Sequence, residues 1–420
     1  LVNYVQRVQV GHHSNNMRHT LIIIATVIVL AGVGIVAYFY FFGNTASVVV
    51  APPKTASLPT AGGTAPAPAS NTIGASTTTA NSSPSATATV PPRLVKVSDG
   101  PIVPGEVVTD KTATASSSLN VAIHYIERQS GNVYEYLVRS GTLTRTSNPT
   151  LPGIPPPVWR PNASAAFVQY LSGADFSTIN SYALFADGSG GFFLPQNLSD
   201  IAVSSTSVLM LASGVNGSVA SLSRTDGTRS SELFTTPLSA LRVSFAGKNT
   251  YLAFTKPSAT LSGSAFIVDS AGHFSRVAGP LNGLVAKASP SGKWVLVSYT
   301  SGGTMQMELV NTATSETLSL PVATIADKCV WTADDSAVYC GVPVSPSPNV
   351  NYPDDWYQGA VSFSDRIWKI DVAGRYAQFV LDFSKENKGA LDAEALAVDP
   401  LNTVLTFVNK NDGSLWSYEL

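Results

Sequence analysis

The side chains best suited to bind a ligand gather in one segment, between Val342 and Ile367. This segment is rich in proline and aromatic residues, and it also carries carboxylates. Rigid aromatic side chains beside polar groups are common where proteins hold a partner tightly. The candidate binding residues are Tyr352, Asp354, Asp355, Trp356 and Tyr357. The alternative is a lid that packs on its own domain, with Trp356 filling a groove.

The chain contains two cysteines, Cys329 and Cys340, on either side of a turn centred on Asp334 and Asp335. Residues at equal distances from the centre of such a turn face each other across an antiparallel pair of strands. We therefore expect a cross-strand disulfide if this part of the chain lies outside the cytoplasm. Its stabilising effect would be modest, because the loop it closes is short. The alternative is a pair of reduced cysteines that act as small buried apolar residues.

Catalytic chemistry finds little support in the sequence. The two histidines after residue 93, His124 and His273, lie in different repeats and have neither metal-ligand nor triad spacing. The sequence also lacks the serine-hydrolase elbow, the zinc-protease motif and the phosphate-binding loop. Most aspartates stand in turns, which they favour on local grounds. We expect no catalytic residue, no metal site and no cofactor.

A repeat of short strands positions these residues, and it occupies residues 93–420. Apolar strands alternate with turns rich in glycine, aspartate, asparagine and serine. The clearest strand of each repeat begins at residues 121, 166, 208, 251, 294, 337 and 404. The steps are about 43 residues, except that the last contains about 24 more, which form the aromatic segment. Four short strands at this period are typical of a β-propeller blade, so seven markers predict seven blades.

The last repeat ends at Leu420 with its third strand, so its outer strand is missing. The short apolar stretch at 93–98, RLVKVS, precedes the first repeat and could supply that strand. Such pairing would close the ring and remove an open sheet edge.

The turns before the marker strands resemble the Trp-Ser-Pro-Asp-Gly-Lys turn of TolB-like or WD40-like propeller repeats. The residues that carry the resemblance are 288–294 (ASPSGKW), 159–162 (WRPN), 331–335 (WTADD) and 398–402 (VDPLN). No repeat has the complete motif, and the Gly-His and Trp-Asp signatures of true WD40 repeats are absent. The resemblance implies an envelope or periplasmic binding module, and it carries over no binding residue.

A candidate membrane helix precedes the repeats, at residues 21–42. These 22 residues contain no charge, and a helix of this length reaches ~33 Å, enough to cross a bilayer core of ~30 Å. Arg7 and Arg18 precede it and the first cation after it is Lys54, so the N-terminus is expected in the cytoplasm. The alternative is a cleaved signal peptide, whose apolar region is usually shorter.

Residues 43–92 are rich in proline, alanine, serine and threonine, and Lys54 is their one charged residue. Such a composition cannot bury enough apolar area to fold, so it predicts a disordered linker. The formal net charge of the whole chain is −2, which predicts no nucleic-acid partner.

Together these features predict a cytoplasmic tail (1–20), one transmembrane helix (21–42), a disordered linker (43–92) and an all-β, seven-bladed propeller (93–420) outside the cytoplasm. The expected function is a membrane-anchored binding or scaffold module of the cell envelope that recognises a protein or a glycan. The alternative is an extracytoplasmic hydrolase or lyase with its site at the central channel.

Overall fold

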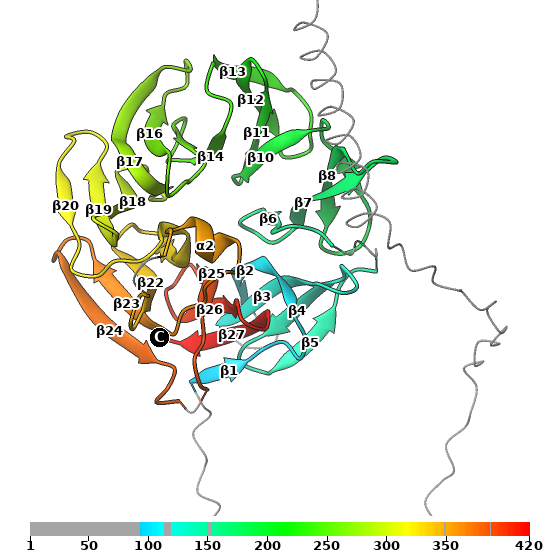
Figure 1. Ribbon diagram of the computed structural model, residues 1–420. Helices are drawn as coiled ribbons and strands as arrows, with labels where there is room; N and C mark the ends of the chain where they lie inside the picture. Colours follow the sequence, from blue (N-terminus) through cyan, green and yellow to red (C-terminus); the bar gives the residue numbers. More distant parts are fainter. Residues whose placement is uncertain (1–92, 113–118, 149–150, 152, 348–349, 387) are drawn as a thin grey trace, which may run out of the picture. The chain divides into compact units, whose positions relative to one another are not determined.

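The computed structural model describes residues 93–420, apart from 113–118, 149–150, 152, 348–349 and 387 (Figure 1). The predicted tail (1–20), membrane helix (21–42) and linker (43–92) lie outside the described residues. In the part of the chain that is described, no helix combines the length and the apolar character that a membrane crossing requires.

The described domain is a ring of antiparallel sheets (Figure 1). Five of these sheets have four strands and one has seven, and the seven-stranded sheet is two blades that share a strand. The domain is therefore a β-propeller with the seven blades that the repeats predict.

Within the first six blades the strands follow one another in chain order from the inner to the outer strand, and in the seventh the outer strand comes from the start of the domain. The first three blades are β2 (Ile102–Thr112), β3 (Leu119–Glu127), β4 (Val133–Leu137), β5 (Thr142–Arg145); β6 (Val158–Trp159), β7 (Ala165–Ser172), β8 (Thr178–Phe185), β9 (Gly191–Phe193); and β10 (Leu198–Val203), β11 (Ser207–Gly214), β12 (Gly217–Arg224), β13 (Ser231–Thr236). The next two share β17: β14 (Leu241–Phe245), β15 (Tyr251–Thr255), β16 (Ser262–Val268), β17 (Phe274–Ala288), β18 (Trp294–Ser301), β19 (Thr304–Asn311) and β20 (Thr317–Ser319). The last two are β21 (Cys329–Trp331), β22 (Ala337–Pro343), β23 (Asp365–Asp371), β24 (Tyr376–Asp382); and β25 (Ala393–Val398), β26 (Val404–Asn409), β27 (Ser414–Glu419), β1 (Leu94–Lys96).

The seven predicted marker strands are confirmed as the second strands of the blades, β3, β7, β11, β15, β18, β22 and β26. A second strand lies inside its sheet and is covered on both faces by neighbouring blades. All residues of β22 and β26 are accordingly buried. Burial on both faces favours continuous apolar runs, which explains why these strands are the clearest in the sequence.

One strand, β17, departs from the predicted pattern of separate outer and inner strands. Its first half pairs with β16 and its second half pairs with β18, so it leaves one blade and enters the next without a break. Gly279 has a φ of 98° at the change of register, where a Cβ would lie 2.4 Å from the carbonyl oxygen of Gly263. Glycine is required there because both the backbone angle and the close approach exclude a side chain.

The ring closes as predicted, through pairing of β1 with β27. Leu94 faces Tyr418, and Lys96 faces Trp416. The Arg93 guanidinium donates hydrogen bonds to the Glu419 carbonyl and lies 4.7 Å from the centre of the Tyr418 ring. The final blade is therefore built from both ends of the described chain.

The connections divide the domain into two faces. The links between second and third strands, and those between successive blades, lie on one side, which we call the lid face. The turns between first and second strands, and between third and fourth strands, lie on the other side, which we call the turn face. The alternation follows from the antiparallel order of each blade.

Candidate functional site

The aromatic segment predicted as a binding loop joins β22 to β23 on the lid face. It contains one short helix, α2 (Asp354–Tyr357), near the centre of the ring (Figure 1). Asp354 accepts a hydrogen bond from the backbone N–H of Ala259 in the fourth blade, at 3.0 Å. The carbonyl of Tyr352 accepts one from Thr300 in the fifth blade, at 3.2 Å. The segment is thus fastened to blades other than its own.

The candidate binding residues do not form one open patch. Tyr352 and Trp356 are each only 3 % exposed and belong to the apolar core. Asp354 and Asp355 are half-buried, and Asp355 accepts a hydrogen bond from the Asn351 backbone. Tyr357 alone is exposed, at 38 %. The burial of Trp356 favours the alternative of a lid that fills a groove, because a ligand cannot reach its ring.

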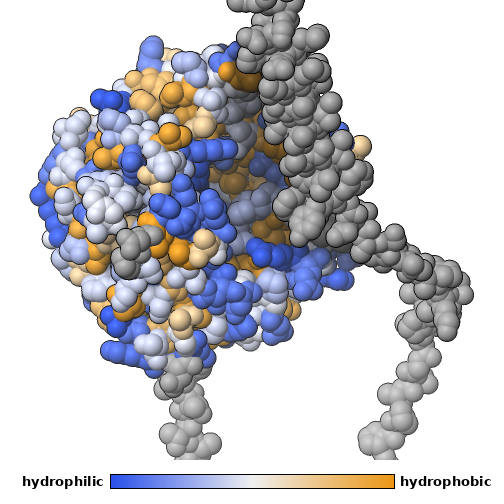
Figure 2. Space-filling view, in the orientation of Figure 1, coloured by the Kyte–Doolittle hydropathy of each residue, from blue (hydrophilic) through white to orange (hydrophobic). Residues whose placement is uncertain are grey.

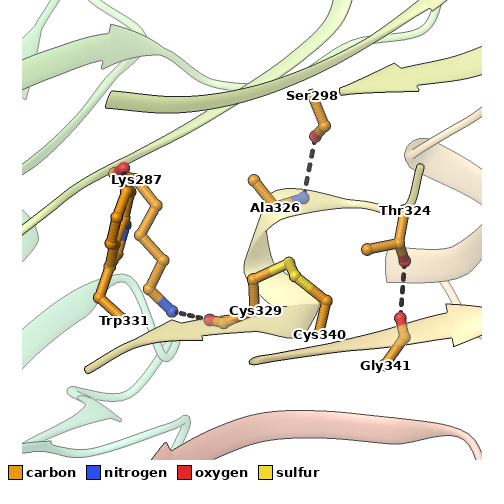
Figure 3. Close-up of a disulfide and its surroundings, with 8 residues drawn as sticks. All are labelled: Lys287, Ser298, Thr324, Ala326, Cys329, Trp331, Cys340 and Gly341. Atoms are coloured by element: carbon orange, nitrogen blue, oxygen red, sulfur yellow. Dashed lines mark hydrogen bonds between the residues drawn. A yellow bond between two sulfur atoms is a disulfide. The ribbon is translucent and has the colours of Figure 1, made fainter. Parts of the chain in front are cut away.

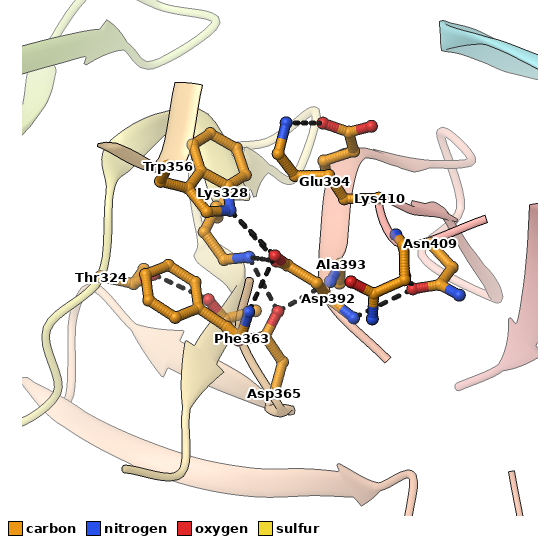
Figure 4. Close-up of polar contacts among 12 residues, drawn as sticks. Thr324, Lys328, Trp356, Phe363, Asp365, Asp392, Ala393, Glu394, Asn409 and Lys410 are labelled. Atoms are coloured by element: carbon orange, nitrogen blue, oxygen red, sulfur yellow. Dashed lines mark hydrogen bonds and ion pairs between the residues drawn. The ribbon is translucent and has the colours of Figure 1, made fainter. Parts of the chain in front are cut away.

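Beneath the lid lies a buried charge cluster that includes Lys328, Asp365 and Asp392 (Figure 4). Lys328 ends the short helix η1 (Ala326–Lys328) before β21, Asp365 begins β23, and Asp392 directly precedes β25. The Lys328 Nζ lies 2.8 Å from Asp365 Oδ2 and also contacts Asp392 Oδ1, and all three side chains are fully buried. Two blades therefore meet at one ammonium group.

Trp356 completes this cluster from the lid. Its Nε1–H donates to Asp392 Oδ2 at 3.0 Å, and the backbone N–H of Phe363 donates to the same oxygen at 2.9 Å. The Lys328 Nζ lies 4.8 Å from the centre of the Trp356 ring and 4.9 Å from that of Phe363. Burial raises the pKa of Asp365 to about 6, although the Lys328 charge opposes that rise.

A second cluster fastens the exposed tyrosine of the lid. Asp327 Oδ2 lies 2.7 Å from Arg242 Nη1 on β14, and it accepts a hydrogen bond from the Tyr357 hydroxyl at 2.7 Å. Burial acts to raise the pKa of Asp327, but the positive charge and hydrogen bond of Arg242 outweigh it and hold the pKa below its ordinary value. Tyr357 thus binds the lid to Asp327, which in turn pairs with Arg242 on an inner strand.

Glu106 stands apart as a buried carboxyl group with an incomplete set of partners. It lies in the irregular part of β2, and its Oε1 accepts a hydrogen bond from Thr406 at 3.0 Å. Its Oε2 has no hydrogen-bond partner among the described residues. Burial raises the pKa of Glu106 to about 8, and the charge of Glu394 adds to this effect. Glu106 therefore keeps its proton at neutral pH.

Cys329 and Cys340 form a disulfide in the structure (Figure 3). They are direct register partners on β21 and β22, and both are buried. The Lys287 Nζ donates to the Cys329 carbonyl, and Trp331 Nε1 donates to the Lys287 carbonyl at 3.3 Å. The bond thus lies within the core, beside an inner strand of the preceding blade.

The histidines lie in separate places. His124 is 3.6 Å from Glu135 in the first blade, whereas His273 pairs with Asp269 on the turn face at 2.9 Å. Burial lowers the pKa of His124. Among the residues that the structure describes, no three histidine, cysteine or carboxylate side chains are placed to hold a metal ion.

Sequence reasoning missed Lys328, Asp392, Glu106 and Arg242. A weak signal exists for the first two, because Lys328 and Asp392 each directly precede an apolar first strand. A charged residue at the entry to an inner strand points to a buried ion pair near the propeller axis, but its partner cannot be read from the local sequence.

Comparison with known proteins bears on the fold alone. No protein-family model and no curated protein matches the chain. Among solved structures, an oligogalacturonate lyase in complex with manganese matches with a TM-score of 0.51 and 9 % identity, covering 76 % of this chain and 98 % of that one. An oligogalacturonate lyase from Vibrio parahaemolyticus gives a TM-score of 0.51 and 8 % identity, covering 77 % and 98 %.

The fold is that of a β-propeller. TolB from Acinetobacter baumannii is also among the matched structures, at a TM-score of 0.40 and 10 % identity, covering 75 % of this chain and 80 % of that one. At such low identity the likeness to the two lyase structures extends to the fold alone. The propeller predicted from the repeats is confirmed, and no ligand or catalytic residue carries over.

Proposed function

We propose that this propeller is a protein-binding module of the cell envelope and that the lid face is its binding surface. The observation that carries the proposal is the distribution of exposed apolar side chains. Of the 13 large ones among the described residues, seven lie outside strands, and six of these seven lie on the lid face. They are Phe176, Val215, Leu238, Leu261, Val344 and Tyr357.

Three neighbouring blades present the most prominent of these side chains. Phe176, Val215 and Leu261 stand in the links between second and third strands of blades two, three and four, and Val215 is fully exposed. Figure 2 shows apolar side chains scattered among polar ones on the side where α2 lies, and a hollow in the middle of the domain. The proposal therefore rests on the concentration of exposed apolar loop residues on this face, and not on one continuous apolar patch.

The chemistry of these side chains favours a protein over a glycan. Only two of the six, Phe176 and Tyr357, are aromatic, whereas four are aliphatic. Aliphatic groups gain free energy by burial against another apolar surface, at about 1.5–3 kcal/mol for each fully buried side chain. The ionisable groups beneath the lid pair with one another, which leaves the apolar loops as the groups free to bind.

A second candidate is a hydrolase or lyase, and one observation favours it. Glu106, on an inner strand, keeps its proton at neutral pH, as a general acid must, although only 7 % of the residue is exposed. Turnover of a polysaccharide or peptide that is lost in Glu106→Gln, with unchanged folding, would support the enzyme. Absence of turnover across such a panel would leave binding as the function.

We further propose that residues 21–42 anchor the chain, with the N-terminus in the cytoplasm and the propeller outside. The 22 uncharged residues and the cations on their N-terminal side support this arrangement. Protease added to intact cells should release the propeller by cutting within residues 43–92. Full protection of the chain would contradict the arrangement.

Affinity capture from the envelope fraction of the source cells tests the binding surface. The lid-face variant combines Phe176→Asn, Val215→Ser and Leu261→Ser; asparagine suits position 176, whose φ is 50°. The matched control changes two exposed side chains at the turn face, with Tyr376→Ser and Leu401→Ser. A partner that the parent and the control recover, and that the lid-face variant loses at least tenfold, supports the proposal. Equal recovery by the lid-face variant contradicts it.

A further inference from the structure

The side chains of Lys328, Asp365 and Asp392 form an arrangement that can do covalent chemistry. One amine and two carboxyl groups are in mutual reach, all fully buried (Figure 4). The rings of Trp356 and Phe363 cover the amine on the side of the lid, and their centres lie within 4.9 Å of Nζ. An enclosed site of this kind excludes the bulk water that would otherwise compete with the amine.

We propose that Lys328 and Asp392 form an intramolecular amide bond between Nζ and Cγ, with Asp365 as the proton carrier. The structure holds the two groups in contact as an ion pair, so the amine starts beside the carboxyl group that it attacks. Holding reactants in contact removes most of the entropic barrier to a reaction between them.

The surroundings of Asp392 fit the role of the group that is attacked. Its Oδ2 accepts two hydrogen bonds, from Trp356 Nε1–H at 3.0 Å and from the Phe363 backbone N–H at 2.9 Å. The Trp356 N–H also makes a longer contact of 3.3 Å with Oδ1. When the amine attacks Cγ, negative charge develops on one carboxyl oxygen. Two fixed N–H donors aimed at that oxygen stabilise the charge, as in an oxyanion hole. Oδ1, which contacts Nζ, is then the oxygen that leaves.

Asp365 fits the role of the proton carrier. Its Oδ2 lies 2.8 Å from Nζ, and the Ala393 backbone N–H donates to the same oxygen at 2.7 Å. Its Oδ1 is buried and has no hydrogen-bond partner among the described residues, so no donor is placed to stabilise an oxyanion there. Burial also raises the pKa of Asp365 to about 6, which strengthens its hold on a proton taken from the amine.

The reaction balances without a further reagent. The Lys328 ammonium gives one proton to Asp365, which passes it to Oδ1 of Asp392, and the free amine then attacks Cγ of the protonated carboxyl group. The C–Oδ1 bond breaks, and Oδ1 leaves as water with two of the three ammonium protons, which Asp365 relays. The third proton stays on the amide nitrogen. An ammonium and a carboxylate thus become an amide and one water molecule, with no oxidation or reduction.

The bond would join positions 64 residues apart and tie the sixth blade to the seventh. The seventh blade is the one that β1 completes, so the cross-link would reinforce the ring beside its closure. This inference does not depend on the proposed partner or on the membrane anchor.

Mass spectrometry of the purified full-length chain tests the proposal. After reduction of the disulfide and denaturation, the intact mass should fall below the sequence mass by one water molecule. Trypsin should then fail to cut after Lys328 and should release the fragment 294–366 joined to the fragment 389–410. An intact mass equal to the sequence mass, with cleavage after Lys328, would overturn the proposal even if every variant failed to fold.

Two matched variants identify the attacked residue. Asp392→Asn should still react and lose ammonia in place of water, because an amide carbon accepts the same attack. Asp365→Asn should lose the proton carrier and retain the unlinked mass. The opposite pattern, with ammonia lost from Asp365→Asn and a cross-link within 294–366, would overturn the assignment to Asp392.

Discussion

Replacing Glu106 by glutamine should abolish one component of the pH dependence of stability. In the folded chain burial raises the Glu106 pKa from 4.5 to about 8. The folded group therefore keeps its proton at most pH values between these two. In the unfolded chain the group loses its proton near pH 4.5. Between these two pH values the folded state binds one proton more than the unfolded state, so the free energy of unfolding falls as pH rises. The stabilisation is complete below pH 4.5 and lost above pH 8.

The size of the effect follows from the shift. At 1.36 kcal/mol per pKa unit, the rise from 4.5 to about 8 amounts to about 5 kcal/mol over the whole window. About 3 kcal/mol of this difference should develop between pH 5 and pH 7.5. Glutamine has a similar shape, can accept the Thr406 hydrogen bond and stays neutral at every pH, so the variant lacks this slope.

Urea unfolding of both proteins at half-unit steps from pH 5 to pH 8.5 measures the effect. All other titrating groups are shared, so the difference between the two free energies isolates Glu106. We expect the variant to gain stability relative to the parent as pH rises. A difference that stays constant within 0.5 kcal/mol, roughly the error expected for unrelated contributions, would refute the burial of an ionisable Glu106.

Three further predictions concern the closure, the disulfide and the lid. Removing residues 93–98 should lower the free energy of unfolding by roughly 4 kcal/mol, since two buried apolar side chains and a strand pairing are lost; unchanged thermal melting would reject the closure. Replacing Cys329 and Cys340 by alanine should cost about 3 kcal/mol by loop entropy, and melting of the parent should be sensitive to a reductant; insensitivity would speak against the bond. Trp356→Phe should cost about 2 kcal/mol in urea unfolding, since it deprives the buried Asp392 of a donor; a neutral effect would contradict the buried lid.

The sequence predicted the blades because their second strands are buried on both faces. Runs such as those of β22 and β26 are wholly buried and mostly apolar, and the turns between them carry glycine and aspartate. The closure by β1 was predictable because the last repeat lacks one strand. The fusion of two strands into β17 was not, since Gly279-Pro280 reads as a break in the local sequence while the backbone continues in a new register.

The site could be predicted only in part. Composition located the lid correctly. Aromatic residues are common both at binding surfaces and in buried segments, so the presence of Trp356 did not distinguish a binding loop from a lid packed on its own domain. The ion pairs of Lys328 join residues 37 and 64 positions away, and no local pattern specifies such partners. The pKa of Glu106 depends on burial between two blades, which no single strand reveals.

Photo-crosslinking in the intact source cells tests the proposed binding surface most directly. A photoreactive amino acid at position 215, which is fully exposed on the lid face, should join the chain to a discrete protein on irradiation. The same amino acid at position 401, exposed on the turn face, should give no such product. A product from position 401 but not from position 215 would contradict binding through the lid face.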